Sequence, residues 1–445
     1  MVNATSRTLF LFALLAALVA TNASAQPKKY TLKDCIRIGM DRSPDLQRSA
    51  NDIERSATYK QQALGAFLPS LNASAAWTRS DKDNIVLRGD NFFTSRNSYS
   101  YSVSSAMTLF DGMSNILNAD RSILGYQAAE KGHERMVEDV VYRIHQGYFN
   151  ALRLQELVKV NQSNLERSKK QLDRIKELNA VGSVPLADVY RQQVQAGRDE
   201  LGVLQAENDS QNALIDLQTL LGLAIADDFA LDASAIPASI EAGDMQQFRS
   251  DIGSEEASLR AARLNRKDVQ QADLTLQSAR KSVSIAWSGH LPSLAAFASY
   301  NWSNAELKEF SNKDFTRFSY GLQLQVPIFN NFLVSTSVQR AEIDRMDSET
   351  MLSTIERSIS ADMRKAMNTL TSAEKNLEIT KRTLFSAQED QRIATERYSL
   401  GAGTLLDVIV ANSNLTAAQS DVVNSTFNYL IARKQVEYQL GTITN

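Results

Sequence analysis

The chain has 445 residues, a formal net charge of −3, one cysteine and three histidines. A net charge this close to zero does not indicate a nucleic-acid partner. The lone Cys35 excludes an internal disulfide framework. His133, His145 and His290 are too far apart in the sequence to form a local metal-ligand cluster, so we expect neither a metal site nor a cofactor.

Residues 1–25 have the pattern of a secretory signal peptide. Arg7 precedes an apolar run from Leu9 to Val19, and Ala23-Ser24-Ala25 supplies the small residues of a cleavage site. The run is too short for a spanning helix, and no later run reaches spanning length. The rest of the chain is therefore expected either to be soluble and exported or to enter a membrane as a β-barrel.

The first structural repeat is predicted at 26–221. A helix precedes two strands at about 70–80 and 97–110, in which apolar and polar residues alternate. A long helix then runs to a tight turn at Val181-Gly182-Ser183-Val184-Pro185, and a second helix returns from it. The polar residues at 80–96 are expected to form an exposed loop.

Residues 222–257 contain Pro237, Gly243 and Gly253 and are predicted to form an irregular connector. The second structural repeat, 258–445, then shows the same order of elements, with strands at about 293–303 and 315–328. Short motifs recur between the halves: Leu-Pro-Ser-Leu stands at 68–71 and 291–294, and Gly-x5-Asp-Val at 182–189 and 401–408. Several matches in one order indicate duplication.

The segment 332–400 contains neither proline nor glycine, so it can form one helix of about 100 Å. Apolar and small residues follow a heptad spacing from Met363 to Tyr398 and from Val408 to Val436. The first half shows the spacing less regularly, at Val189, Ala196, Val203, Ser210 and Leu217. Each half is therefore expected to end in a coiled-coil hairpin with a tight tip. The seams are rich in alanine and bury little area per residue, so we expect further helices to pack beside them.

The four predicted strands suit a transmembrane barrel, although the strands of a water-soluble sandwich also alternate. They occur only as two hairpins separated by long helices. Four strands cannot close around a lumen, and open edges are not tolerated in lipid. Several copies would have to pool their strands, and eight, twelve or sixteen strands are all arithmetically allowed.

From about Tyr30 to Gly441 the chain resembles the TolC-like outer-membrane efflux family. The resemblance rests on the duplication, on Leu-Pro-Ser-Leu entering each half's first strand, on Thr108-Leu109-Phe110-Asp111-Gly112, and on Tyr398, Gly401 and Leu405-Leu406-Asp407-Val408. It implies a mainly α fold with β: coiled-coil hairpins form a periplasmic tunnel, and four transmembrane strands per chain contribute to a twelve-stranded outer-membrane barrel in a homotrimer.

The same resemblance implies an outer-membrane channel of a tripartite efflux or type I secretion system. Its partners would be a periplasmic adaptor, an inner-membrane pump of the RND or ABC type, and outer-membrane lipid. The sequence indicates neither the substrate nor the pump class.

The resemblance also assigns candidate site residues. Asp188 and Tyr398 match residues that hold the periplasmic gate shut, and Asp407 matches an aspartate ring that would attract cations. Gly182 and Gly401 match tip positions that meet the adaptor, although helix C-capping explains both glycines equally well. The chain departs from the family pattern at Val410, where a second ring aspartate would stand, and at Gly403, where a tip arginine would stand.

Two other classes were weighed. An exported coiled-coil scaffold or adhesin explains the signal and the long helices but not the serine-rich and aromatic hairpins. An enzyme is not indicated, because the sequence contains no nucleophile–base motif, phosphate loop or metal-ligand set. No catalytic residue is predicted.

Overall fold

The computed structural model describes residues 29–88, 91–225, 229–233, 240–307, 310 and 312–443. The predicted signal peptide, 1–25, lies outside them. The helices are α2 (Leu32–Arg42), α3 (Pro44–Gly65), α4 (Ser114–Ala180), α5 (Leu186–Leu220), α6 (Ala242–Ile252), α7 (Glu255–Asn265), α8 (Lys267–Ser288), α9 (Leu333–Ser399) and α10 (Leu405–Leu440). The strands are β1 (Lys29–Tyr30), β2 (Ser70–Arg88), β3 (Asn91–Phe110), β4 (Ala230–Leu231), β5 (Ser293–Asn304) and β6 (Thr316–Gln325), with a short 3-10 helix at Lys313–Phe315.

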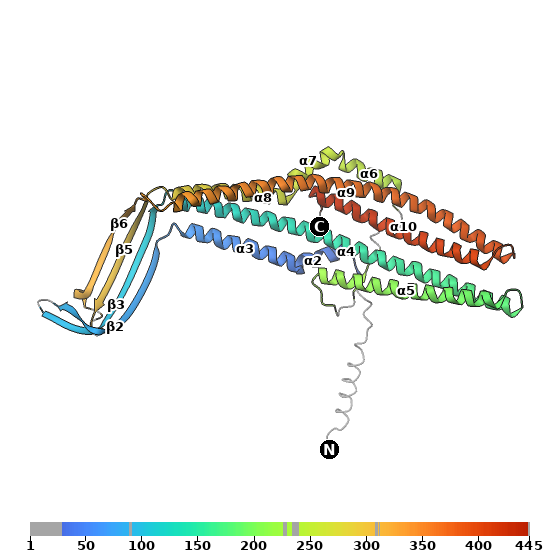
Figure 1. Cartoon of the computed structure of the whole chain (residues 1–445), viewed down its shortest axis with the longest axis horizontal. Coiled ribbons are helices and arrows are strands. Elements are labelled where there is room, and N and C mark those ends of the chain that lie inside the picture. Colours follow the sequence, from blue (N-terminus) through green and yellow to red (C-terminus); the bar gives the residue numbers. More distant parts are fainter. Residues whose placement is uncertain are drawn as a thin grey trace, which may run out of the picture. The chain divides into compact units, whose positions relative to one another are not determined.

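The chain divides into two compact units, and both draw on both halves of the sequence (Figure 1). Unit 1 comprises the described residues of 1–44, 138–257 and 364–445. Unit 2 comprises those of 45–137 and 258–363. The two 67-residue helices, α4 and α9, each contribute to both units.

Unit 1 is built on the heptad seams. On α9 and α10 the seam side chains are buried: Met363 at the unit's border, then Ala366, Leu370, Ala373, Leu377, Ala387, Val408, Ala411, Leu415, Ala418, Tyr429, Ala432 and Val436. The less regular seam of α5 is buried as well, at Val189, Ala196, Val203 and Leu217. The coiled-coil prediction is therefore confirmed. No helix in the part of the chain that the structure describes is both long and apolar enough to cross a membrane.

The predicted irregular connector at 222–257 is wrong for its second half, because α6 and the start of α7 lie there. Asp244 accepts a hydrogen bond from the backbone N–H of Glu241 at 3.2 Å, which caps α6. Phe248 and Ile240 then pack into the seam of α9 and α10. Burial against an existing seam explains why this short helix is stable although its sequence is rich in turn-forming residues.

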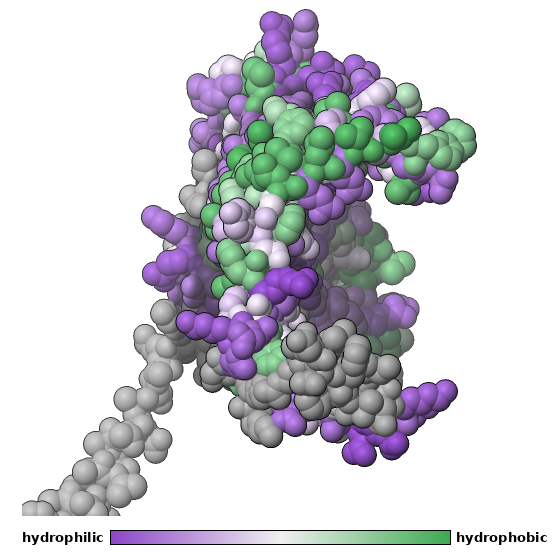
Figure 2. All heavy atoms as spheres, turned by 90° about the vertical axis from the view of Figure 1, so that its left-hand side faces the viewer, coloured by the Kyte–Doolittle hydropathy of each residue, from purple (hydrophilic) through white to green (hydrophobic). Residues whose placement is uncertain are grey.

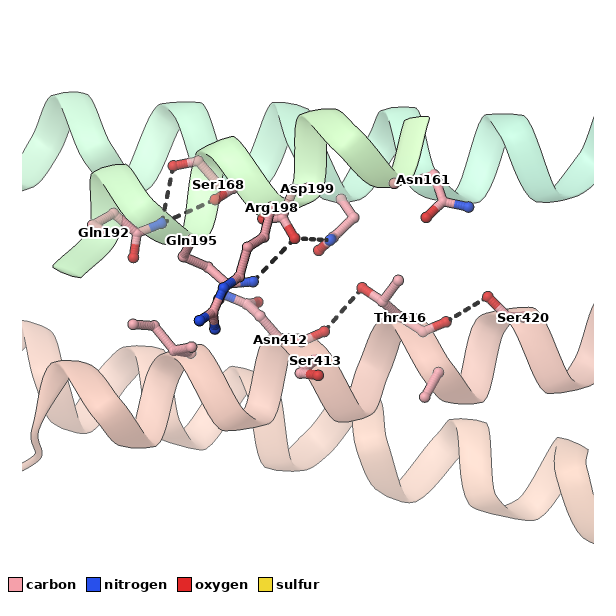
Figure 3. Close-up of a pocket in the computed structure, with 14 residues that line it drawn as sticks. Asn161, Ser168, Gln192, Gln195, Arg198, Asp199, Asn412, Ser413, Thr416 and Ser420 are labelled. Atoms are coloured by element: carbon pink, nitrogen blue, oxygen red, sulfur yellow. Dashed lines mark hydrogen bonds between the residues drawn. The ribbon is translucent and has the colours of Figure 1, made fainter. Parts of the chain in front are cut away.

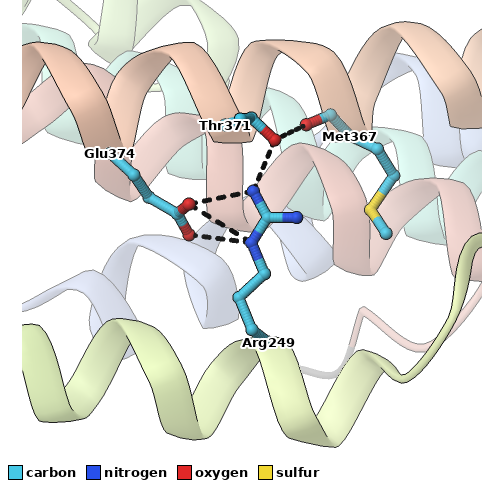
Figure 4. Close-up of polar contacts among 4 residues, drawn as sticks. All are labelled: Arg249, Met367, Thr371 and Glu374. Carbon is cyan, nitrogen blue, oxygen red and sulfur yellow. Dashed lines mark hydrogen bonds and ion pairs between the residues drawn. The ribbon is translucent and has the colours of Figure 1, made fainter.

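A side-chain network joins α6 to α9 (Figure 4). The Arg249 guanidinium donates to both carboxylate oxygens of Glu374, at 2.9–3.2 Å, and to the Thr371 hydroxyl. Thr371 in turn donates to the Met367 carbonyl at 2.9 Å. An arginine fork that grips a carboxylate through two nitrogens fixes orientation as well as distance, so the network sets the position of α6 on α9.

Unit 2 contains an antiparallel four-stranded sheet in the order β2-β3-β5-β6. β3 and β5 join the two hairpins, with Tyr101 opposite Trp302 and their rings stacked at 5.4 Å. β2 and β6 form the two edges. The sheet therefore presents an unpaired row of backbone N–H and C=O groups on each side within this chain.

The strand boundaries differ from those predicted. β2 continues to Arg88 rather than 80, and β3 begins at Asn91 rather than 97, so most of the expected loop at 80–96 is paired strand. The run Ile85-Val86-Leu87 has high β propensity, which explains the extension. At the other end of the sheet, β6 stops at Gln325 instead of 328, because Pro327 cannot donate a ladder hydrogen bond.

One face of this sheet is apolar and exposed. On β6 the exposed side chains are Phe318, Tyr320, Leu322 and Leu324, and Val326 follows directly after the strand. Val103, Met107 and Leu109 of β3 are exposed too. Figure 2 views the molecule from the end where the strands lie and shows apolar side chains gathered there. A soluble monomer rarely leaves so many large apolar residues together in water, so this face needs an apolar environment.

The turn from β3 into α4 depends on a glycine. Gly112 has φ +69°, and an added Cβ would lie 2.7 Å from the Ser288 carbonyl oxygen at the end of α8. Only glycine fits this conformation and this approach. The turn thus fixes where the strand ends and the long helix begins.

We expect Arg249→Met to loosen α6 while leaving the seams intact. The change removes the bonds to Glu374 and Thr371 and should cost about 1 kcal/mol, because the pair is partly exposed to solvent. Hydrogen exchange should show faster exchange of the amides at 242–252 with unchanged protection in α10. Arg382→Gln is the control, because Arg382 forms only an exposed 3.9 Å pair with Glu378. Equal amide exchange rates at 242–252 in both variants would show that the Arg249 network does not hold α6 in place.

Candidate functional site

The candidate site residues lie in unit 1, at the turns of the two coiled-coil hairpins. The first turn closes α4 with two hydrogen bonds: Gly182 N–H donates to the Asn179 carbonyl at 2.9 Å, and Ser183 N–H donates to the Leu178 carbonyl at 2.8 Å. Gly182 has φ +77°. This pair of bonds with a left-handed glycine is a Schellman motif.

The second turn repeats the motif at the end of α9. Gly401 N–H donates to the Tyr398 carbonyl at 3.1 Å, Ala402 N–H donates to the Arg397 carbonyl at 2.8 Å, and φ of Gly401 is +74°. An added Cβ would meet nothing within 4 Å at Gly182 or Gly401. Both glycines are therefore C-caps, and the space outside both turns is open to a second molecule.

Asp407 caps the helix that leaves the second turn. Its carboxylate accepts hydrogen bonds from the Thr404 N–H and hydroxyl, both at 2.9 Å, and Thr404 Oγ1 accepts from the Asp407 N–H at 3.3 Å. These bonds to Thr404 lower the pKa of Asp407 below the usual range. The carboxylate is therefore ionised at neutral pH, and its position is fixed by the turn.

Asp188 and Tyr398 lie close together without a hydrogen bond between them. Asp188 pairs with Arg191 at 2.9 Å on its own helix. Tyr398 Oη is buried and has no hydrogen-bond partner among the described residues. Burial, and then the charge of Asp188, raise the pKa of Tyr398, while Arg174 opposes the shift.

An apolar cluster lies directly behind the turns. Ile175 of α4, Val189 of α5 and Leu405 of α10 are buried against one another, and Tyr398 and Ile409 pack on their edge. Sequence reasoning placed Val189 on a seam but missed that three helices meet here. Leu405 entered the sequence analysis only as part of the motif at the second turn, and a heptad seam indicates contacts inside one hairpin, not those between hairpins.

The two departures from the family pattern also have structural consequences. An added Cβ at Gly403 would lie 3.2 Å from both the Arg397 Cβ and the Tyr398 N, so the turn is too tight there for a side chain without adjustment. Arg397 instead donates to the Ala402 carbonyl at 3.1 Å. Val410 is 49% exposed, and its side chain carries no charge.

Within the described ranges no group of three or more His, Cys, Asp or Glu side chains is arranged to hold a metal ion. The chemistry available at the turns is therefore that of a fixed carboxylate, a buried phenol and an apolar contact. Such groups can hold helices together and can bias the passage of ions.

Comparison with known proteins identifies the family of this chain. The family model for outer membrane efflux proteins matches residues 39–223 and again 258–442. The outer membrane protein TolC of Escherichia coli is 24% identical over 421 residues, which cover 90% of this chain and 80% of TolC. The protease secretion protein PrtF of Dickeya chrysanthemi is 23% identical, covering 90% of this chain and 86% of PrtF.

Among solved structures, the CmeC outer membrane channel of Campylobacter jejuni superposes with a TM-score of 0.76 at 18% identity, covering 92% of this chain and 85% of CmeC. At that identity the likeness shows the fold. The double match of the family model extends over most of the sequence and confirms the predicted resemblance: the chain belongs to the outer membrane efflux protein family.

Proposed function

We propose that the chain is the outer-membrane channel of a tripartite efflux or type I secretion system. It would be a passive exit duct for substrates that an inner-membrane pump delivers through a periplasmic adaptor. The observation that carries this proposal is the four-stranded sheet with one exposed apolar face and two open edges, in a chain of this family. The chemistry at the turns supports a conduit rather than an enzyme.

The open edges support assembly of several copies. β2 of one copy and β6 of the next can pair their free backbone groups, and a head-to-tail contact of this kind closes a ring if the rotation is right. Three copies give twelve strands, the number that the family resemblance implies. The ring would span the outer membrane with its apolar face toward lipid.

The helices of unit 1 support the same head-to-tail contact. α9 packs on α10 at Ala387 and Leu415, and α10 packs on α4 and α5 through Leu405, so α9 and α5 are the end helices. Each carries exposed apolar residues off its seam. They are Tyr190, Val194, Leu201 and Leu204 on α5, and Ile379, Phe385 and Ile393 on α9, with Leu400 directly after that helix.

On α5 these residues lie on one helix face, and on α9 they form a broader stripe on the side away from the seam. An exposed apolar stripe on each end helix fits burial against the neighbouring copy.

The gate is proposed at the hairpin turns. Three copies would bring three ionised Asp407 carboxylates toward a symmetry axis, which would attract cations and disfavour anions. Asp188 and Tyr398 would act at the same level, together with the apolar contact of Ile175, Val189 and Leu405. Gly182 and Gly401, on the open side of the turns, are the proposed points of approach for the adaptor.

An exported coiled-coil scaffold or adhesin is the competing proposal, and fractionation separates the two. As a channel, the protein should sediment with outer membranes, require detergent for extraction, and run as an oligomer on unheated gels. Recovery as a soluble periplasmic monomer would exclude the channel. Single-channel conductance of the purified oligomer in planar bilayers then tests transport itself.

The head-to-tail contact predicts a specific cross-link. Leu204 and Ile379 lie at nearly the same height above their turns, so Leu204→Cys with Ile379→Cys should form disulfide-linked dimers and trimers under mild oxidation. Leu204→Cys with Leu400→Cys is the matched control, because Leu400 lies about 30 Å lower along the helices. Native Cys35 should not form a disulfide in this experiment, because burial raises the pKa of its thiol to about 12. Equal cross-linking in both pairs, or in neither, would contradict the contact.

The proposed gate predicts that one substitution raises the open fraction of the channel and that another leaves its conductance unchanged. Ile175→Ala should remove about 2–5 kcal/mol of packing energy. If about 1.4 kcal/mol of this loss affects the closed state and not the open state, the ratio of open to closed channels rises tenfold. Tyr398→Phe should leave conductance unchanged, because the phenolic hydroxyl has no partner to lose. Bilayer recordings measure both. A large increase for Tyr398→Phe with none for Ile175→Ala would mean that the hydroxyl, and not the apolar contact, holds the gate.

A further inference from the structure

A polar cavity of about 320 Å³ lies between the two hairpins of unit 1, above the apolar cluster (Figure 3). α4 and α5 form one wall, and α10 forms the other. Its lining consists mainly of amide, hydroxyl and charged side chains. By contrast, the seams within the hairpins consist mainly of alanine and larger apolar residues, with a few buried polar ones such as Ser210 and Ser425.

Two buried acceptors of this cavity lack partners. Gln192 on α5 is 2% exposed, and its amide nitrogen donates to the Ser168 carbonyl and hydroxyl at 3.1 and 3.0 Å. Because only the NH₂ group can donate to a carbonyl, the amide orientation is fixed, and Oε1 is left without a donor. Asn412 Oδ1, across the cavity on α10, is also buried without a donor in the described structure. Both oxygens require an N–H or O–H group.

The cavity also has one charge that remains available. Asp199 already accepts hydrogen bonds from Asn164 and Gln195, both at 3.0 Å. Arg198 lies on the open side and reaches toward α10 in Figure 3, and no hydrogen bond is recorded for its guanidinium among the residues described. A free guanidinium fork is suited to a carboxylate.

We propose that this cavity binds a small carboxylate that also carries a hydroxyl or ammonium donor. Arg198 would hold the carboxylate at the open side. An ammonium group would donate to both Gln192 Oε1 and Asn412 Oδ1, whereas a hydroxyl, which has one hydrogen, would donate to Asn412 Oδ1 alone. Since Arg198 and Asn412 belong to different hairpins, the bound ligand joins the hairpins. A ligand that joins the hairpins would also hold the proposed gate closed. Only this effect on gating rests on the proposed channel function.

Three four-carbon dicarboxylates test the assignment on the full-length purified oligomer. L-Malate adds a hydroxyl to the succinate skeleton, L-aspartate adds an ammonium group, and succinate has neither. By calorimetry at least one of malate and aspartate should bind ten or more times tighter than succinate. Which of the two it is tells whether the natural ligand is a hydroxy acid or an amino acid. Absence of saturable binding by both, or equal binding of succinate, would overturn the proposal.

Variants locate the site. Arg198→Gln should weaken binding at least tenfold, and because Arg198 is exposed the variant should fold. Asn412→Leu should reduce the preference over succinate, because Asn412 Oδ1 accepts from either donor group. Arg382→Gln, the same change on an exposed face of α9, should bind like the unchanged protein. Binding that is unaffected by Arg198→Gln would place the ligand elsewhere and overturn the proposal.

Bilayer recordings test the bridging step. A saturating amount of the tighter ligand should lower the open fraction at least twofold, and unchanged conductance would overturn the bridging. Conductance without any added ligand tests the channel function alone. A channel that conducts and does not bind these acids would therefore overturn only the present inference.

Discussion

The backbone N–H and C=O groups at the two edges of the sheet need hydrogen-bond partners, and the rest of the structure depends on how they find them. β2 and β6 leave one side of each strand unpaired within the chain, while the apolar side chains of β6 leave one face of the sheet unsuited to water. A lipid environment satisfies the face and makes open edges intolerable. A neighbouring copy that pairs β2 with β6 resolves both requirements together, which is why self-association is central to the proposed function.

The helical unit obeys the same rule with side chains instead of backbone groups. Each alanine-rich seam allows close packing but buries little area, so a hairpin gains stability from the helices beside it. α10 packs on α9 and also on α4 and α5, whereas α6 covers part of α9. Away from these contacts, α5 and α9 keep exposed apolar residues. A chain whose sheet and helices both end in unsatisfied surfaces fits the proposed contact with another copy of itself.

Sequence periodicity was sufficient for the elements whose partners lie in one hairpin. The heptads of α9 and α10 and the alternation of β6 could be predicted because each depends on local spacing. The helix α6 was missed because the glycine at 243 indicated a connector, and its stability comes from Phe248 packing on distant residues. The extent of β2 was underestimated because polar residues around 81–84 interrupt its alternation.

The candidate site was predictable only in part, for a related reason. Asp188, Tyr398 and Asp407 could be assigned by resemblance, but their bonding partners could not. Asp188 pairs with Arg191 and Asp407 bonds to Thr404, whereas the Tyr398 hydroxyl has no hydrogen-bond partner among the described residues. Where a hydroxyl is buried without a partner, it contributes little to closure, and the neighbouring apolar contact must supply the cohesion. Farther from the tips, the contacts between the hairpins include hydrogen bonds from Arg153 to Asn424 and from Arg167 to Thr416, and the cavity lining there is polar. Separating the tips alone would break one small apolar cluster rather than a whole seam, and that proportion fits the gate proposed at the turns.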